Sequence, residues 1–291
     1  MLKRLGIYLK EMFPLSSFLG TMITAITIQL VYLRLYDIRV EFSRQLIIPG
    51  LVLTFVSLLI RIMDEFKDYQ DDLTNFPLRP LPSGRVKRED LKALGLFCVI
   101  AIVFLSVTSK PLLLWSLATL IFTGLMLKWF FVEKLMRKSL PLAFLSHHPI
   151  VVFNFIYLIL ACMQMDPRVG WDKILSILPI CLIFTNWEIL RKIRTPEQET
   201  TYTTYSKIWG PRKSIGLALV IQLIFSASVL CICESLKISP LWMAGFIILQ
   251  LGVSFPSWRF LFTLKLSAPL KQQAELQIIS VILFLLVIAL I

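Results

Sequence analysis

Charged residues are scarce in this sequence. Asp, Glu, Lys and Arg make up 16% of its 291 residues, and the charges are confined to short clusters. The net charge is +12, but no basic soluble domain is present, which excludes nucleic-acid binding by such a domain. So few charges in so apolar a chain are typical of an integral membrane protein.

Metal-binding and redox patterns of cysteine and histidine are also missing. The five cysteines all lie in apolar runs, and Cys231-x-Cys233 is too short for a CxxC redox or zinc motif. We interpret these cysteines as small buried or lipid-facing side chains. The two histidines, His147 and His148, have no cysteine or acidic residue near them at a metal-ligand spacing.

Long apolar runs fill most of the chain instead. Hydrophobic residues make up 57% of it, and its mean hydropathy is +0.78. A transmembrane helix needs about 20 mostly apolar residues. The sequence therefore predicts an all-α, multi-pass membrane protein, a single domain over residues 1–291, with nine transmembrane helices at about 14–35, 45–63, 91–108, 111–131, 140–164, 172–190, 213–233, 238–255 and 272–291.

Lysine and arginine fall mostly in the loops on one side of these runs. The positive-inside rule then places the N-terminus and these loops in the cytoplasm, and the C-terminus on the opposite side. The two longest cytoplasmic loops, 64–90 and 191–213, each follow a run that ends in acidic residues. They lie four spans apart, which suggests an internal duplication of a four-helix unit.

The N-terminal segment gives an expectation about location. Its first apolar run is long enough to span a membrane and lacks a small-residue cleavage site, so we expect no cleavable signal peptide. It also lacks an Arg/Ser-rich, acid-poor presequence. We therefore expect the inner membrane of a bacterium rather than a mitochondrion.

The segment 64–72 places five carboxylates in nine residues, directly after an apolar run. Glu65, Asp68 and Asp72 are spaced i, i+3, i+7 and would share one face of a helix, which Asp64 borders. Carboxylates in such an array repel one another unless a divalent cation bridges them. Oxygen-only ligands favour Mg²⁺, whose shell is usually completed by waters and substrate phosphates.

The acidic segment leads into Arg79-Pro80-Leu81-Pro82-Ser83-Gly84-Arg85. Prolines at 77, 80 and 82 stop a helix and set an extended turn. Arg79 and Arg85 could face the same ligand as the metal, which would balance its charge with a phosphate. The alternative is a solvated loop of mixed charge.

These two elements together resemble the first motif of the UbiA superfamily of intramembrane prenyltransferases. That motif reads N-D-x-x-D-x-x-x-D, followed by an R-P-[IL]-P-S-G turn. This chain has Asp64 in place of Asn and Glu65 in place of Asp, and the turn matches without change. The resemblance implies nine transmembrane helices around a central cavity that opens to the cytoplasm. It also implies Mg²⁺ and an isoprenoid diphosphate bound between two acidic motifs.

The second motif of the family, after the sixth span, is altered. Glu188 takes the first acidic position, Arg191 and Lys192 stand where the next acid is common, and Glu197 and Glu199 resemble a later acidic cluster. We expect this site to hold diphosphate more through Arg and Lys than through a second metal. The alternative is that Arg191, Lys192 and Arg194 are ordinary positive-inside anchors.

Further substrate-binding candidates follow from the same resemblance. Lys128, at the end of the fourth span, resembles a lysine that contacts the diphosphate, and Lys10 resembles a basic residue that opens the first helix. Snorkelling at a helix end is the alternative for Lys128. Aromatic and polar side chains that could line the pocket, although packing is their default role, are Asn186, Trp187 and either Tyr202 or Tyr205.

His147 and His148 precede Pro149 inside the fifth span. A histidine there could act as a base toward an acceptor hydroxyl or a carbocation's proton. A hydrogen-bonded packing role is the alternative, because polar groups at membrane depth usually face a cavity or another helix.

The predicted activity is Mg²⁺-dependent ionisation of an allylic isoprenoid diphosphate, followed by transfer of the prenyl group to an aromatic or other acceptor. Asp68 and Asp72 would be the main metal ligands, with Asp64, Glu65 and Glu188 assisting, and Asp68, Asp72 and Glu188 are the catalytic candidates. The diphosphate candidates are Lys10, Arg79, Lys128, Arg191, Lys192 and Tyr205. The partners would be this diphosphate, the acceptor and membrane lipid, with no nucleic acid.

Three alternatives stay open. The first is cyclisation of the isoprenoid without an acceptor, as in UbiA-type terpene cyclases. The second is transfer of a sugar phosphate to a lipid phosphate, a phosphoribosyl-type reaction with which the extra basic residues are compatible. The third is a non-enzymatic role, such as a transporter or an assembly factor, which would predict no loss of function when Asp68 is substituted.

Overall fold

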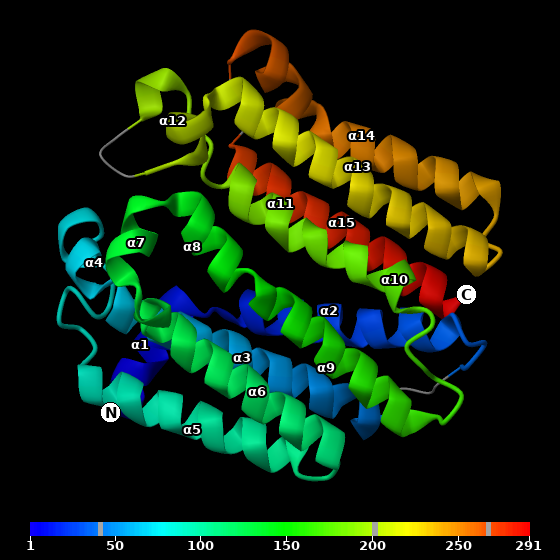
Figure 1. Cartoon of the computed structure of the whole chain (residues 1–291), viewed down its shortest axis with the longest axis horizontal. Coiled ribbons are helices and arrows are strands. Elements are labelled where there is room, and N and C mark those ends of the chain that lie inside the picture. Colours follow the sequence, from blue (N-terminus) through cyan, green and yellow to red (C-terminus); the bar gives the residue numbers. More distant parts are fainter. Residues whose placement is uncertain (40–42, 200–202, 266–268) are drawn as a thin grey trace. The chain divides into compact units, whose positions relative to one another are not determined.

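The protein is described by a computed structural model that covers residues 1–39, 43–199, 203–265 and 269–291 (Figure 1). All regular elements in these residues are helices, so the predicted all-α class is confirmed. The chain forms two compact units. Unit 1 comprises Met1–Gln29, Glu41–Arg137 and Ile156–Asp166, and unit 2 comprises Leu30–Val40, Lys138–Phe155 and Pro167–Ile291. The expectation of a single domain over 1–291 stays a prediction.

Unit 1 is built around α3, which packs against α5 and α6. A short helix α4 follows α3 directly, and the helices α2 and α9 contribute residues to both units. The bounds of these elements are α1 Leu2–Met12, α2 Leu15–Arg34, α3 Arg44–Lys67, α4 Tyr69–Asn75, α5 Arg88–Ser106, α6 Lys110–Leu127, η1 Trp129–Phe131, α7 Glu133–Lys138 and α9 Pro149–Met165.

Unit 2 contains the C-terminal helices. In it, α13, α14 and α15 lie side by side, and α11 packs against both α13 and α15 (Figure 1). The bounds are α8 Leu140–His147, α10 Ile174–Ile177, η2 Leu178–Cys181, α11 Leu182–Leu190, η3 Pro196–Gln198, α12 Tyr205–Trp209, α13 Pro211–Ser235, α14 Pro240–Thr263 and α15 Leu270–Leu290.

Seven helical segments of the described residues are long and apolar enough to cross a membrane, which marks an integral membrane protein. They correspond to α2, α3, α6, the pair α8–α9, α13, α14 and α15. The other two expected spans coincide with α5 and with the broken segment Ile174–Leu190, which do not meet the same criteria. The count of nine spans therefore stays a prediction.

Prolines fix where several of these helices begin. Pro111, Pro211 and Pro240 stand in the first turn of α6, α13 and α14, and α9 begins at Pro149. Proline suits this position because the first turn has no internal partner for the N–H that proline lacks, and its fixed φ is already helical. The same residue type breaks the expected span 140–164 into α8 and α9.

The fourth span ends earlier than its hydropathy suggests. The expected span 111–131 ends in three consecutive aromatic residues, but α6 ends at Leu127. Trp129, Phe130 and Phe131 all have positive φ, between 50° and 61°. This left-handed conformation is costly for residues with a Cβ and cannot continue an α-helix. The chain therefore turns away from the helix axis directly after Lys128.

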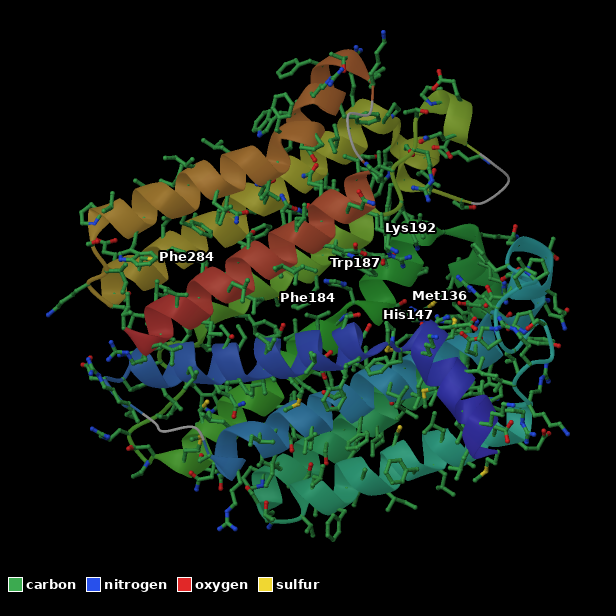
Figure 2. All side chains as sticks on the ribbon, turned by 180° about the vertical axis from the view of Figure 1, so that it is seen from behind. Met136, His147, Phe184, Trp187, Lys192 and Phe284 are labelled. Carbon is green, nitrogen blue, oxygen red and sulfur yellow. The ribbon has the colours of Figure 1, made fainter. Side chains whose placement is uncertain are left out.

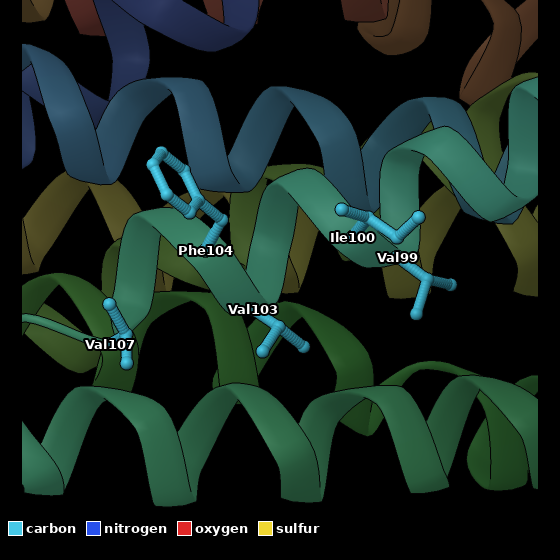
Figure 3. Close-up of a pocket in the computed structure, with 5 residues that line it drawn as sticks. All are labelled: Val99, Ile100, Val103, Phe104 and Val107. Carbon is cyan, nitrogen blue, oxygen red and sulfur yellow. The ribbon is translucent and has the colours of Figure 1, made fainter.

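One face of α5 forms an open apolar groove, lined by Val99, Ile100, Val103, Phe104 and Val107 (Figure 3). Four of these side chains come from α5 and the fifth, Val107, from its C-cap, and none carries a polar group. An exposed apolar stripe on a helix of a membrane protein suits contact with lipid chains. We therefore interpret the groove as a lipid-facing surface and place no reactive site in it.

The Arg79–Gly84 segment is a compact turn closed by its own backbone. Ser83 N donates to Arg79 O at 3.0 Å, and Val86 N donates to Pro80 O at 3.0 Å. Leu81 and Val86 are buried beneath the turn. Gly84 has a φ of 74°, in the left-handed region that glycine adopts without strain.

The N-terminal helix α1 is tied to both ends of the segment 85–90, which follows this turn. Arg4 donates two hydrogen bonds to Asp90, at 2.6 and 2.9 Å, and Arg85 makes a two-pronged ion pair with Glu11. Paired guanidinium–carboxylate contacts fix orientation as well as distance. Arg85 is therefore engaged with α1, so it is not free to face a ligand in the way the sequence suggested.

Gly84 and Gly6 provide a matched test of this turn. A Cβ added at either position meets nothing within 4 Å, so only the backbone conformation differs. Gly84→Ala should lower the free energy of unfolding by about 1 kcal/mol because of its positive φ, and Gly6→Ala, in the interior of α1, should raise it by about 0.5–1 kcal/mol. Denaturant titration in detergent measures both. Equal effects at the two sites would contradict the assignment of strain to Gly84.

Candidate functional site

The first acidic cluster lies where α3 ends and α4 begins. Asp68 joins the two helices and has φ −101° and ψ 11°, outside the helical range. Hydrogen bonds of helical type still run on both sides of it, from Asp68 N to Asp64 O and from Asp72 N to Asp68 O, each 2.9 Å. The expected single helical face through Glu65, Asp68 and Asp72 is thus interrupted at its middle carboxylate.

Most carboxylates of the cluster are paired with a cation within unit 1. Asp64 pairs with Lys67 at 2.9 Å, and Asp72, which is buried, pairs with Arg79 at 2.6 Å. Arg79 also stacks on the ring of Phe76, with 3.9 Å from Cζ to the ring centroid. The arginine of the Arg79–Gly84 turn is thus placed on a predicted metal ligand.

Glu65 is completely buried, and Arg61 on the preceding turn donates to its Oε1 at 2.5 Å. Its other oxygen, Oε2, has no hydrogen-bond partner among the described residues. Arg61 was not predicted from the sequence, although its spacing from Glu65 is a signal. An arginine inside an apolar run, four residues before a glutamate, is the spacing of a helical ion pair.

Asp68 differs from its neighbours because no cationic side chain of the described residues lies within ion-pair distance of it. Burial, opposed by the charge of Lys67 and reinforced by the charges of Asp64 and Asp72, raises the pKa of Asp68 to about 6. A half-buried carboxylate without its own counter-ion is the group of this cluster most in need of an added cation.

Trp129 connects the cluster to the loop after α6. This contact was also not predicted from the sequence. Lys67 lies 4.8 Å from the centre of the Trp129 ring, and Arg137 lies 5.2 Å from it. Arg137 in turn pairs with Asp71 at 2.7 Å and with Glu133 at 2.7 Å. The aromatic ring therefore shares two cations with the acidic segment through cation–π contacts.

Lys128 and Lys10, two of the predicted diphosphate contacts, lie in unit 1. Lys128 is the exposed C-cap of α6 and makes no ion pair among the described residues. The residue before it, Leu127, lines a small cavity together with Asp64 and Lys67, so the end of α6 adjoins the acidic cluster. Lys10 is exposed in the last turn of α1.

The donor set of the first cluster suits one kind of metal binding. The described residues contain no group of three His, Cys, Asp or Glu side chains placed to hold a metal by themselves. Mg²⁺ is usually held by one or two carboxylates, and waters and phosphate oxygens fill its other positions. An unpaired Asp68 beside Asp64 and Asp72 fits that arrangement. It does not fit a metal held by protein groups alone.

The second cluster follows from the short helix α11 in unit 2. Both oxygens of Glu188 are engaged: Oε2 accepts from Arg191 Nε at 2.6 Å, and Oε1 lies 2.9 Å from Lys192 Nζ. Arg191 also lies over the Trp187 ring, at 4.8 Å. One carboxylate thus faces two cations. A metal ion at Glu188 would have to displace them.

The loop after this cluster is held by hydroxyl groups and by backbone. Glu199 accepts hydrogen bonds from Thr204 Oγ1 at 2.7 Å and from Ser206 Oγ at 2.6 Å, so its oxygens are engaged within the loop. Glu197 is exposed in η3, and Arg194 donates to carbonyl oxygens of its own turn.

Tyr205, a predicted substrate contact, is fully buried. Its ring stacks on Trp209 with centroids 5.1 Å apart and meets Phe144 edge-on at 6.3 Å. Its backbone N donates to Lys192 O at 3.1 Å, which ties α12 to the second cluster. Tyr202, the alternative candidate, lies outside the described residues.

The two histidines lie on either side of the break between α8 and α9. His148 Nε2 is 2.5 Å from Thr185 Oγ1 on α11, and its ring stacks on Phe144 at 4.5 Å. His147 Nδ1 lies 2.8 Å from Ala143 O. Figure 2 labels His147 at the end of α8, and Phe184, Trp187 and Lys192 along α11 and the turn after it. These contacts give His148 a hydrogen-bonded, packed environment next to α11.

Comparison with known proteins gives the fold. No family model and no curated protein matches the chain. Two solved structures do match it. A UbiA homolog from Aeropyrum pernix K1, in its apo form, has a TM-score of 0.64 at 14% identity, over 90% of this chain and 94% of its own. A digeranylgeranylglyceryl phosphate synthase has a TM-score of 0.59 at 20% identity, over 99% of both chains.

The chain therefore has the fold of these UbiA-type proteins, as the resemblance of its first motif predicts. At these identities the likeness establishes the fold and leaves the reaction to be argued from the residues.

If the first cluster binds Mg²⁺ as the sequence predicts, Asp68 should make that binding depend on pH. Because its pKa is raised to about 6, it is ionised at pH 7 and protonated below pH 6, and a protonated carboxyl cannot bind the metal. The affinity for Mg²⁺ with an allylic diphosphate should fall by up to about tenfold per pH unit below pH 6. Isothermal titration calorimetry measures this, and Asp68→Asn should remove the step. An unchanged wild-type affinity from pH 7 to pH 5 would contradict the role of Asp68.

Proposed function

We propose that this protein is a Mg²⁺-dependent intramembrane prenyltransferase of the UbiA superfamily, which ionises an allylic isoprenoid diphosphate and transfers the prenyl group to an acceptor. The observation that carries the proposal is the first acidic cluster on this fold. One of its carboxylates, Asp68, has no counter-ion among the described residues and lies between carboxylates that have one. The cluster adjoins an Arg79–Gly84 turn whose arginine reaches Asp72.

Asp68 and Asp72 would hold Mg²⁺, with Asp64 and Glu65 as further oxygen donors. When bound, the ion would neutralise charge on the diphosphate that it shares with these carboxylates. Arg79 now neutralises Asp72 at 2.6 Å, so a cation that takes over this role leaves the guanidinium free to donate to phosphate oxygens. Further candidates for that contact are Lys10 and Lys128, which is exposed at the end of α6 and makes no ion pair with another described residue.

The bond that breaks joins the allylic carbon to the diphosphate oxygen. Its electron pair leaves with the diphosphate, whose negative charge grows in the transition state. Fixed cationic side chains stabilise that growing charge most when water is excluded. The allylic cation that remains is captured by the acceptor, which then loses a proton.

The second cluster contributes positive charge in this proposal. Arg191 and Lys192 together outweigh Glu188, and their side chains are 35% and 13% exposed. We assign Glu188 the role of a counter-ion that pairs with these two cations until phosphate oxygens replace it. The structure gives Glu188 no free oxygen with which to bind a metal of its own, unless one of the cations moves.

The proposal also covers orientation in the membrane. The loops 64–90 and 191–213 carry both clusters and are rich in Lys and Arg, which favours a cytoplasmic position for them and for the N-terminus. The diphosphate would then be drawn from the cytoplasmic side. A bacterial inner membrane is the expected location.

Substitution at Asp68 or Asp72 tests the reaction. Asp68→Ala and Asp72→Ala should each lower Mg²⁺-dependent turnover of allylic diphosphates by at least about a hundredfold, because the leaving diphosphate loses its metal. Asp71→Ala is a matched control within the same segment. Asp71 is exposed and pairs with Arg137, so this variant should keep most of the activity. Turnover at the wild-type rate in both test variants would refute the proposal.

The same assay separates prenyl transfer from its nearest alternative. Purified protein is incubated with an allylic diphosphate and no acceptor, and the products are identified by mass spectrometry. Little product is expected until a hydroxylated or aromatic acceptor is added. A hydrocarbon or a terpene alcohol formed without an acceptor would instead identify a terpene cyclase.

Glu188→Gln separates a metal ligand from a counter-ion that competes with the diphosphate for Arg191 and Lys192. Removing the charge of Glu188 releases Arg191 and Lys192 from a pair of contacts at 2.6 and 2.9 Å, so diphosphate affinity should be kept or increased by up to about tenfold. Lys192→Ala should lower the affinity. Binding of a Mg²⁺–prenyl diphosphate complex by calorimetry gives both values. A large loss of affinity in Glu188→Gln would show that Glu188 binds metal.

A further inference from the structure

The C-terminal helices carry a stripe of amide and hydroxyl side chains inside an apolar bundle. On α14, Gln250, Ser254 and Ser257 are spaced i, i+4, i+7, and α15 repeats the spacing with Gln273, Gln277 and Ser280. All of these except Ser280 are buried. Polar side chains inside a membrane bundle are rare and usually have a specific partner or role.

Hydrogen bonds join the two stripes at both ends. Ser257 donates to Gln273 Oε1 at 2.8 Å, and Gln250 Nε2 donates to Ser280 Oγ at 3.0 Å. The middle residue of α15 has a different partner. Asn186 on α11 donates from Nδ2 to Gln277 Oε1 at 2.8 Å. The stripe therefore ties α15 to α14 at two points and to α11 at one.

The pair formed by Asn186 and Gln277 is not explained by stability. Both residues are 1% exposed, and after their one hydrogen bond Asn186 Oδ1 and Gln277 Nε2 have no partner among the described residues. In an apolar interior, two open polar groups cost more than one neutral hydrogen bond contributes, and two apolar side chains of similar size would pack there at lower cost. A buried polar pair of this kind is best attested as a device that fixes register.

The helix that needs such a device is α11. The segment Ile174–Leu190 is broken into α10, a 3₁₀ turn and α11, so α11 has only nine residues and is not held in line by a long regular helix. Its buried face consists of apolar side chains such as Ile183 and Leu190, together with Asn186. Aliphatic contacts tolerate small rotations and shifts, whereas a hydrogen bond at 2.8 Å does not.

Rotation of α11 would move the second cluster. Glu188 follows Asn186 by two residues, about 200° around a helix, so the two side chains lie on opposite faces. Asn186 faces α15, and Glu188 with Arg191 lies on the partly exposed face that also carries Phe184 and Trp187. Asn186, one of the predicted pocket-lining residues, donates to Gln277 on α15, and its role in a pocket stays a prediction.

We infer that Gln277, through its hydrogen bond to Asn186, is a positioning residue that fixes the rotation of α11 and thereby places Glu188, Arg191 and Lys192 for the diphosphate. This inference rests on the proposed function for its catalytic consequence. The register that it assigns to α11 can be measured without any substrate.

The test replaces the pair by an apolar one in the full chain, reconstituted in lipid nanodiscs. Asn186→Leu with Gln277→Leu should leave the melting temperature unchanged or raise it. It should lower kcat/KM for an allylic diphosphate by about tenfold or more, because the cations are misplaced. Hydrogen exchange of residues 182–194, followed by mass spectrometry, should be faster in this variant than in the wild type.

Two variants serve as controls. Asn186→Gln with Gln277→Asn exchanges the two amides, keeps the summed side-chain length and should restore kcat/KM and exchange to near wild-type values. Gln222→Leu removes a bond of 2.9 Å to Ser254, between α13 and α14 of the same unit, and should change neither reading. This control separates the general loss of an amide from the loss of the bond to α11.

Each remaining outcome decides the inference. Wild-type kcat/KM and exchange in the leucine pair would overturn it. A leucine pair that fails to fold would assign the amides to stability and would also overturn it. If the wild type shows no turnover at all, the proposed function fails, and exchange of residues 182–194 alone then decides whether the bond fixes α11.

Discussion

Charge pairing at the end of an apolar helix is the constraint on which the first cluster depends. Ion pairs engage Asp64, Glu65 and Asp72 of the segment 64–72, and the described residues leave Asp68 without one. Buried carboxylates are tolerated only with such partners. An added cation would therefore stabilise the cluster most at Asp68. Arg61 and Lys67 are charged residues at the end of a membrane-spanning helix. Because they pair with carboxylates of the cluster, their role there is structural.

In the proposed function, each of the two clusters would bind phosphate in a different way. The first has more carboxylates than cations and suits a metal that arrives with phosphate oxygens. The second has one carboxylate between two cations, and Trp187 supports one of them. A polyanion can bind directly to such a group, since guanidinium and ammonium groups supply both charge and donors. The basic residues that stand in the second motif are therefore chemically suited to an anionic group.

Packing around the clusters holds them by contacts that are distant in the sequence. Arg4 and Glu11 of α1 fix the segment after the Arg79–Gly84 turn, and Trp129 shares Lys67 and Arg137 with the acidic segment. In unit 2 the backbone N–H of Tyr205 binds the turn after α11, and the side chain of Gln277 binds Asn186 within α11. The supporting residues are as specific in their geometry as the charged groups that they place.

The sequence by itself determined the all-α class, most helix positions and the residue types of both clusters, because hydropathy, proline and the i, i+4 spacing act over a few residues. It also contained signals that were overlooked, such as Arg61 and the amide stripe of α15. Tertiary structure decided which carboxylate has no counter-ion, that Glu188 is shared by two cations, and that Asn186 faces Gln277. Those outcomes depend on which distant side chains packing brings within hydrogen-bonding distance, and local spacing carries no information about that.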